Sequence, residues 1–194
     1  MIHPIVTFGN EALRQKAVPV TDVTDDIRKL ATDMLETMYA AKGLGLAAEQ
    51  IGRNACICVI DVPPDAEKEA YRAANASVAM PLVLINPEIL SREGKQRNDE
   101  GCLSFPDIGA SITRANQVTV AFTTLTGERR TVTAQGLLAR AIQHEVDHLN
   151  GILLVDKMSP IQRLAVSGQL KRLQANAREN GERKIFKQSE GNAR

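Results

Sequence analysis

The stretch Gln143-His144-Glu145-Val146-Asp147-His148-Leu149-Asn150-Gly151 holds two of the three histidines of this chain. Helix periodicity leads into it through Leu137, Leu138, Ala141 and Ile142, so a helix is expected to carry it. Positions i and i+4 share a helix face, so His144 and His148 can converge on one metal ion. Glu145 then lies beside the metal, placed to move protons for a bound water. The stretch therefore predicts a helix-borne metal site that activates water.

Outward from this helix, the remaining chain alternates between helical and extended patterns. The expected elements are an amphipathic helix over 25–42 with Gly43 as its C-cap, strands over 55–61, 81–86, 117–124 and 129–134, and a last helix from Ser159 towards Ala177. Strands on both sides of one internal helix predict an α+β fold. We expect antiparallel or mixed β-sheets around a central helix carrying the H-E-x-x-H motif, plus a C-terminal helix.

The length of 194 residues predicts one compact domain. We place a single catalytic domain at 1–178. Residues 62–80 are polar, rich in alanine and bounded by prolines, which favours a surface insertion over a second domain. Residues 179–194 are polar and are expected to form a flexible tail.

Composition argues against several other classes of protein. Apolar residues make up 43% and charged residues 24%, as in ordinary globular domains. A net charge of +1 gives no argument for a DNA or membrane partner. The chain has no apolar run near the ~20 residues that span a bilayer, and its first residues lack a secretory signal pattern. Three unevenly spaced cysteines favour a reducing compartment, so we expect a cytoplasmic protein.

Two histidines need a third protein ligand to make a catalytic metal site. In one class of zinc protease that ligand is a histidine ten residues after the first of the pair, a position that Leu154 occupies here. Another class uses a later glutamate, but Glu179, Glu182 and Glu190 lie in or near the expected tail. His3 is a lone terminal histidine and reads as a surface or capping residue.

The best remaining donor is Cys102, in the segment Glu100-Gly101-Cys102-Leu103-Ser104-Phe105-Pro106. A lone cysteine is more often part of a core than a ligand, but a two-histidine motif without a third donor reverses that preference. Cys56 and Cys58 share one face of an expected strand and read as core. The same segment suggests an ion pair between Glu100 and Arg114 that supports the cysteine loop.

Three segments of the chain resemble, in order, the signature motifs of peptide deformylases: 43–50 (Gly-Leu-Gly-Leu-Ala-Ala-Glu-Gln), 100–104 (Glu-Gly-Cys-Leu-Ser) and 144–149 (His-Glu-Val-Asp-His-Leu). The resemblance implies hydrolysis of the formyl group from the N-terminal formylmethionine of nascent polypeptides, which releases formate. It implies a metal ion on Cys102, His144 and His148, with Glu145 as the general base. One departure is Glu49, where the family commonly has proline and where glutamate adds a charge near the site.

The resemblance also assigns roles in substrate binding. It places the Gln50 side-chain amide and the Leu103 backbone N–H at the oxyanion, although Gln50 alone reads equally well as an exposed loop residue. The peptide is expected to lie like an added strand beside Leu44, Gly45 and Gly101. Leu137 and Ala141 could line an apolar pocket for the methionine side chain, or simply belong to the core. Asp147 and Gln143 are weighed as hydrogen-bond partners of the ligating histidines.

The resemblance also bears on the metal and on the partners. One divalent ion is expected: the resemblance favours Fe²⁺ as the native ion, with Zn²⁺, Ni²⁺ or Co²⁺ as substitutes. Two other functions stay open, namely a metalloprotease that cleaves internal peptide bonds and a non-catalytic protein that binds nascent chains or ribosomes. Residues 159–194 hold eight Lys/Arg and three Asp/Glu, an excess of 8 − 3 = +5, so this segment could contact the ribosome or form a solvated helix face.

Overall fold

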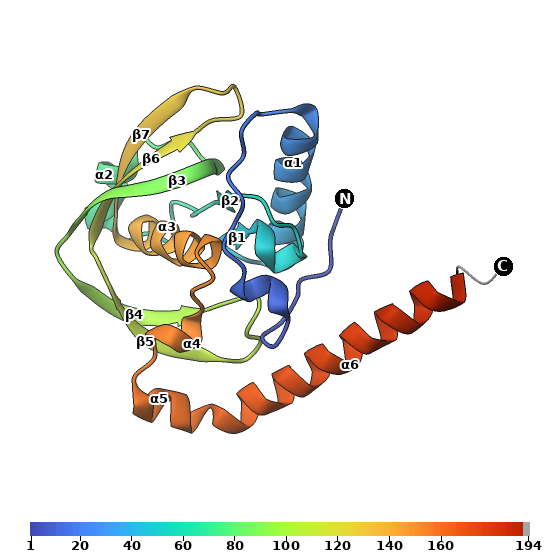
Figure 1. Cartoon of the computed structure of the whole chain (residues 1–194). Helices are drawn as coiled ribbons and strands as arrows, with labels where there is room; N and C mark the ends of the chain where they lie inside the picture. The colour runs from blue at the N-terminus through green and yellow to red at the C-terminus, as the bar shows by residue number, and fades with distance from the viewer. Residues whose placement is uncertain (192–194) are drawn as a thin grey trace.

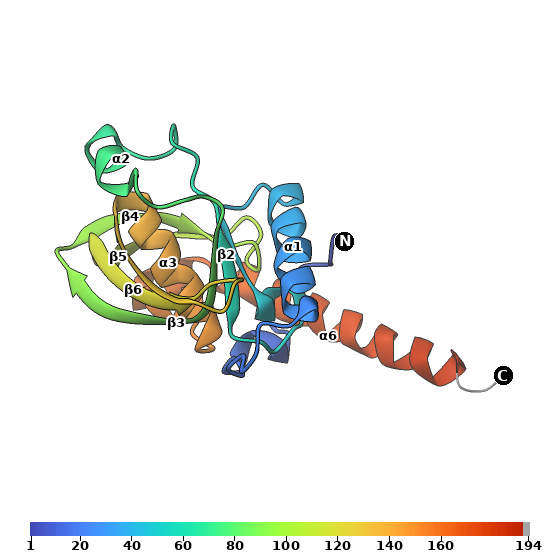
Figure 2. The same ribbon diagram turned by 90° about the horizontal axis from the view of Figure 1, so that it is seen from above.

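Helix α3 (Gly136–Leu149) lies between two antiparallel sheets in the computed structural model, which describes residues 1–191 and the side chains of residues 1–179 (Figure 1, Figure 2). The larger sheet has the order β1-β2-β3-β6-β7, with β1 at Gly45–Ala47, β2 at Ile57–Ile60, β3 at Leu82–Glu93, β6 at Gln117–Thr123 and β7 at Arg129–Gln135. The smaller sheet pairs β4 (Gln96–Gly101) with β5 (Gly109–Arg114).

The remaining elements surround this centre. They are η1 (Glu11–Arg14), α1 (Asp25–Ala40), η2 (Ala48–Ile51), α2 (Glu69–Asn75), α4 (Leu154–Lys157), α5 (Pro160–Ala165) and α6 (Ser167–Gly191). The predicted α+β fold around a central motif helix is confirmed. Every strand pair among the described residues is antiparallel, so the mixed sheet that the prediction allowed is not found.

Several predicted boundaries shift for identifiable reasons. Helix α1 ends at its C-cap Ala41 rather than at Gly43, because Lys42 takes the left-handed backbone conformation (φ 56°) that usually selects glycine. Strand β3 continues well past residue 86, where the predicted strand ended. The predicted last helix is divided into α5, capped as expected by the Ser159 hydroxyl, and α6, which extends beyond Ala177 to Gly191.

One face of α3 packs into the core beneath the larger sheet. Leu138, Ile142 and Leu149 are at most 3% exposed and belong to one apolar cluster with residues of β2, β3, β6 and β7, including Cys58. Cys56, which precedes β2, is partly buried and packs against this cluster. Burying a leucine or isoleucine side chain contributes roughly 1.5–3 kcal/mol to folding. This packing fixes the rotation of α3, so its opposite face, with His144, points away from that core.

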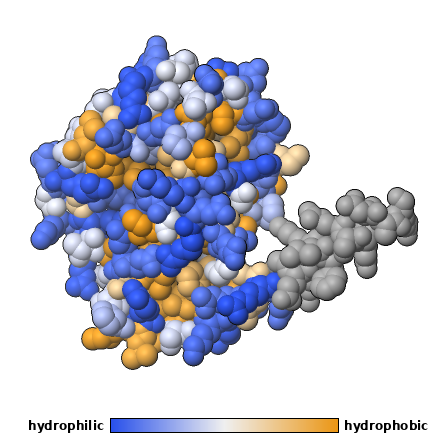
Figure 3. Space-filling model, in the orientation of Figure 1, coloured by the Kyte–Doolittle hydropathy of each residue, from blue (hydrophilic) through white to orange (hydrophobic). Residues whose placement is uncertain are grey.

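The insertion at 62–80 folds back onto the domain. Its helix α2 contacts β7, and Glu67 is 6% exposed although it precedes an otherwise polar, exposed helix. The face in Figure 3 is mainly hydrophilic, with apolar side chains in separate patches. No helix among the described residues is long and apolar enough to cross a membrane.

Candidate active site

Three potential metal donors meet where the end of β4 approaches α3. Cys102 directly follows β4, and donor atoms of Cys102, His144 and His148 lie within 4.8 Å of one another. The Cys102 Sγ is 3.3 Å from the His148 Nε2, and the two imidazole rings stand edge-on with centroids 5.0 Å apart. A thiol and two imidazoles form a mixed sulfur–nitrogen set that suits zinc or a divalent transition metal such as iron.

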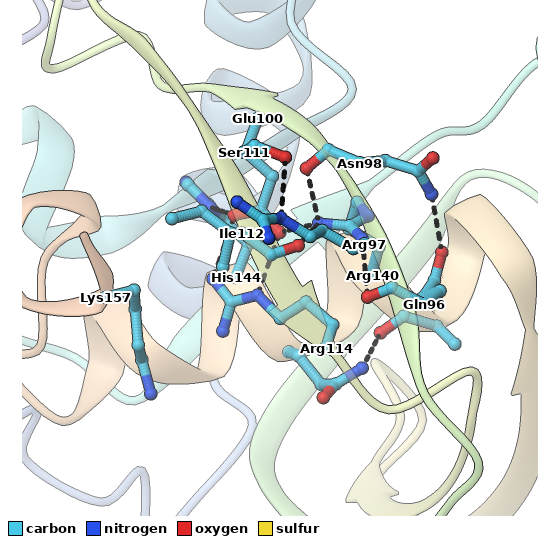
Figure 4. A network of polar contacts seen from close by, with 12 residues as sticks. Gln96, Arg97, Asn98, Glu100, Ser111, Ile112, Arg114, Arg140, His144 and Lys157 are labelled. Atoms are coloured by element: carbon cyan, nitrogen blue, oxygen red, sulfur yellow. Dashed lines mark hydrogen bonds and ion pairs between the residues drawn. The ribbon is translucent and has the colours of Figure 1, made fainter. Parts of the chain in front are cut away.

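The orientation of His144 is set by Glu100 (Figure 4). The Glu100 Oε2 lies 3.2 Å from the His144 Nδ1, and Arg114 donates two hydrogen bonds of 2.8 and 2.9 Å to the same carboxylate. Arg140 forms a further ion pair with it. Burial alone would raise the pKa of Glu100, but hydrogen bonds from His144 and Arg114 outweigh burial and hold that pKa below its usual range. With Nδ1 donating to Glu100, the Nε2 of His144 is free to bind a metal.

These contacts show which of the supporting roles expected for Arg114, Asp147 and Gln143 occur in the structure. The expected ion pair between Glu100 and Arg114 is confirmed. Asp147 pairs with Arg114 and with Lys157, whose Nζ lies 3.4 Å away, so its partner is a basic neighbour rather than a histidine. Gln143 hydrogen-bonds the backbone of Ala115 and is also no partner of the ligands. The pairing of Glu100 with Arg114 was expected from the sequence, whereas its contact with His144 was not.

Glu145 is a buried carboxylate next to the three donors. Glu145 is only 4% exposed, and its Oε2 has no hydrogen-bond partner among the residues that the structure describes. Burial raises the pKa of Glu145 to about 7, which suits a group that takes up and returns a proton near neutrality. A Cβ atom on Gly45 would lie 2.3 Å from the Glu145 Oε1, so glycine is needed for β1 to pass this close.

Gln50 is held against the cysteine loop. Its Oε1 accepts a hydrogen bond of 2.9 Å from the Ala47 N–H, and its Nε2 donates to the Ser104 Oγ at 3.2 Å and approaches the Cys102 Sγ at 3.6 Å. Gln50 is 2% exposed, which excludes the interpretation as an exposed loop residue. The side-chain amide is therefore positioned beside the donors before any substrate binds.

A cavity of about 640 Å³ opens onto these groups. Its volume falls within the usual range for small-molecule sites. It is lined by every residue proposed from the sequence for substrate binding and for the oxyanion: Leu44, Gly45, Gln50, Gly101, Leu103, Leu137 and Ala141. It is also lined by residues that were not expected from the sequence, among them Lys42, Phe105 and Arg140.

Glu49 is buried at 1% exposure, and neither of its carboxylate oxygens has a partner within the described part of the chain. Burial, with a smaller contribution from the nearby Glu145, raises the pKa of Glu49 to about 8. At pH 7 most molecules therefore carry a neutral acid here. Desolvation therefore opposes the charge that the sequence led us to expect at Glu49.

The buried Glu145 carboxylate, whose Oε2 has no partner among the described residues, lies beside a thiol and two imidazoles. Metal-dependent hydrolases are a class of protein that combines these groups. Comparison with known proteins narrows the class. The family model described as polypeptide deformylase matches residues 2–164. This chain belongs to the polypeptide deformylase family.

Individual relatives agree with this assignment. The peptide deformylase of Acidobacterium capsulatum is 44% identical over 178 residues, which cover 90% of this chain and 96% of the relative. The crystal structure of the Thermus thermophilus enzyme matches with a TM-score of 0.78 and 36% identity, covering 91% of this chain and 99% of that one. The Synechococcus elongatus enzyme in complex with actinonin matches with a TM-score of 0.75 and 39% identity, covering 86% and 87%.

Proposed function

We propose that the chain removes the formyl group from N-formylmethionyl nascent peptides, using Cys102, His144 and His148 to hold one divalent metal ion. When bound, that ion would supply Lewis acidity to the water and to the carbonyl oxygen. The observation that carries this assignment is the buried Glu145 carboxylate beside three converging donors, with no partner for its Oε2 among the described residues. Neither alternative function is favoured by the relatives, which are peptide deformylases.

Glu145 would move the proton in this reaction. As water attacks the formyl carbon, its carboxylate accepts a proton, and it then returns that proton to the amine nitrogen as the C–N bond breaks. The products are formate and a peptide with a free amino terminus. A pKa near 7 supports both steps, because the group can be deprotonated before the attack and can give up its proton after it.

Gln50 and Leu103 would stabilise the negative charge on the carbonyl oxygen during attack. The support is that both line the cavity and that Gln50 is already anchored by hydrogen bonds to Ala47 and Ser104. The peptide would lie along Leu44, Gly45 and Gly101 as an added strand. Leu137 and Ala141, one turn apart on α3, would line the pocket for the methionine side chain.

The direct test combines two assays and one variant. Purified protein should release formate from a formyl-Met-Ala-Ser peptide and leave casein intact. Glu145→Gln should lower kcat by roughly 10²–10⁴-fold, the usual contribution of acid–base catalysis. Its metal content should be unchanged because no ligand is lost. Casein cleavage, or full activity in the variant, would overturn the assignment.

Gln50→Ala should reduce kcat by ~10²–10³-fold, the usual effect of losing one oxyanion donor. The metal ligands stay in place, so metal analysis should still give one ion per chain. Full retention of turnover would remove Gln50 from the mechanism.

We propose Fe²⁺ as the native ion, with Zn²⁺, Ni²⁺ or Co²⁺ able to replace it. The thiol of Cys102 and the two imidazoles form a mixed sulfur–nitrogen set, which is compatible with each of these four ions. An iron-loaded enzyme should lose activity in air, and exchange with nickel or cobalt should prevent the loss. An enzyme that stays active in air without exchange would argue for zinc.

We also propose that the protein acts in the cytoplasm, where nascent chains emerge, and that its basic C-terminal segment contacts the ribosome. The supporting observation is the +5 excess (8 − 3) over residues 159–194. Deletion of residues 178–194 should weaken sedimentation with ribosomes at low salt while formyl-peptide hydrolysis continues. Unchanged sedimentation would end this part of the proposal.

A further inference from the structure

The insertion between β2 and β3 supplies a cap for helix α3. The Glu67 Oε1 accepts a hydrogen bond of 3.2 Å from the Leu137 N–H, and its Oε2 accepts one of 3.1 Å from the Leu138 N–H. These early amides have no acceptor inside the helix, and an N-cap side chain usually satisfies them. The N-cap residue Gln135 makes no such side-chain bond. A carboxylate from 70 residues earlier in the chain takes its place, with favourable charge for a helix N-terminus.

Asn75, at the other end of α2, secures this cap. Its Nδ2 donates to the Glu67 Oε2 at 3.2 Å and to the Gln135 carbonyl at 3.0 Å, and its Oδ1 accepts from the Gln135 N–H at 2.9 Å. The fit is close at Gly136, where a Cβ atom would lie 2.6 Å from the Glu67 Oε1 and 2.3 Å from the Tyr71 ring. We call the pair Glu67 and Asn75 the insertion clasp.

The insertion clasp holds the first turn of α3, which contributes Leu137 to the lining of the substrate cavity. Leu137 lines that cavity, and Ala141 and His144 follow it on the same helix face. Leu138 points the other way and is buried in the core at 1% exposure. Loosening of the first turn would therefore displace Leu137, while His144 and His148, two and three turns further along, stay fixed by Glu100 and by the core.

We propose that Glu67 is a positioning residue for substrate recognition: through the capped first turn of α3, it fixes where Leu137 stands in the cavity. The insertion thus tunes how the N-terminal side chain of the peptide is bound and leaves the chemistry at the metal donors alone. This inference rests on the proposed function, because it takes the cavity to be the formyl-peptide site.

The test compares Glu67→Ala, Asn75→Ala and Glu67→Gln with a matched control, Glu69→Gln, whose side chain is exposed on the same insertion. Each holoenzyme is assayed with formyl-Met-Ala-Ser and formyl-Leu-Ala-Ser peptides. Glu67→Ala should raise KM for the methionyl peptide by about fivefold, or roughly 1 kcal/mol of binding. Preference for methionine over leucine should fall, with kcat within twofold and one metal ion retained. Glu67→Gln keeps one acceptor oxygen and should show a smaller effect, and Glu69→Gln none.

Two outcomes overturn the inference. KM and side-chain preference in Glu67→Ala could match the control, or kcat and metal content could fall together with no change in KM. If Glu67→Ala does not fold, Glu67→Gln and Asn75→Ala decide by the same criteria.

Amide hydrogen exchange separates this inference from the proposed function, because it needs no activity. The Leu137 and Leu138 amides should exchange about tenfold faster in Glu67→Ala, and the amides of residues 144–148 should be unchanged. Equal exchange of the Leu137 and Leu138 amides in both proteins contradicts the clasp. Failure of the wild type and of Glu69→Gln to deformylate any peptide contradicts the proposed function instead.

Discussion

Glu49 shows what a single side chain costs when it is buried with no partner among the described residues. Its pKa is raised by folding from an ordinary 4.5 to about 8. The folded state therefore binds this proton more tightly than the unfolded state does. The proton bound to Glu49 contributes its full stabilisation of the folded state below pH 4.5. This contribution to the free energy of unfolding is lost as the pH rises towards 8, by up to about 1.4 kcal/mol per pH unit.

Glu49→Gln should remove this dependence. Between pH 5.5 and 8 the free energy of unfolding of the wild type should fall relative to that of the variant, because glutamine has no proton to lose. Urea unfolding at pH 5.5, 7 and 8 measures the difference, with Glu69→Gln as an exposed-carboxylate control. Parallel pH curves for the wild type and Glu49→Gln would show that Glu49 is solvated or paired in solution.

At the scale of elements, strand β1 and helix α3 meet at a glycine. Gly45→Ala would bring a methyl group to 2.3 Å from the Glu145 Oε1, so either the carboxylate or the strand must move. We expect kcat/KM to fall by roughly 10²-fold if Glu145 has the proposed role, as for other small displacements of a catalytic group. Gly168→Ala in α6, where an added Cβ meets nothing within 4 Å, should change activity less than twofold.

Activity of Gly45→Ala equal to that of the control would mean that Glu145 can be displaced without cost. A crystal structure of the variant would then show which element gives way. Loss of activity together with loss of metal would indicate that the whole contact between β1 and α3 has shifted.

The elements that could be predicted are those whose side chains form a recognisable pattern in the sequence. The alternation of 117–124 and the apolar stripe before His144 predicted β6 and α3, because burial on one face leaves a period in the sequence. The turn residues Thr126, Gly127 and Glu128 predicted β7 as the partner of β6. Strand β4, with the sequence Gln-Arg-Asn-Asp-Glu-Gly, has no such period and was not predicted. Its only buried residue is Glu100, held by Arg114, Arg140 and His144 rather than by apolar packing.

The residues around the site also fall into those that the sequence predicted and those that it did not. Cys102, His144 and Glu145 were recognisable from their motifs, which are short and local. The role of Glu67 was not, because its partners are backbone amides of Leu137 and Leu138, and a backbone amide has no sequence signature. The charge of Glu100 predicted Arg114 as a partner, but its contacts with Arg140 and His144 depended on the path of β4.

At the scale of the whole molecule, the proposed metal ion would join two parts of the fold. Cys102 belongs to the loop after β4, and both histidines belong to α3. Binding to the folded state alone stabilises it by about 2.7 kcal/mol at a free concentration of 100 Kd. For a chain of this size that corresponds to a Tm higher by roughly 5–10 °C.

Removal of the metal by a chelator should lower Tm by that amount, and returning the ion should restore it. Calorimetry of the wild type gives the shift, and Cys102→Ser should show a much smaller one. A Tm that does not respond to the chelator would mean that the donors are held in place without an ion.

The order in which these donors are synthesised has its own consequence. The thiol of Cys102 precedes the imidazole of His148 by 46 residues. At translation speeds of about 5–20 residues per second, several seconds pass before the second histidine follows the cysteine out of the ribosome. Loading of the proposed cation would therefore be a late event in biogenesis, and cells starved of the metal should accumulate full-length apoprotein.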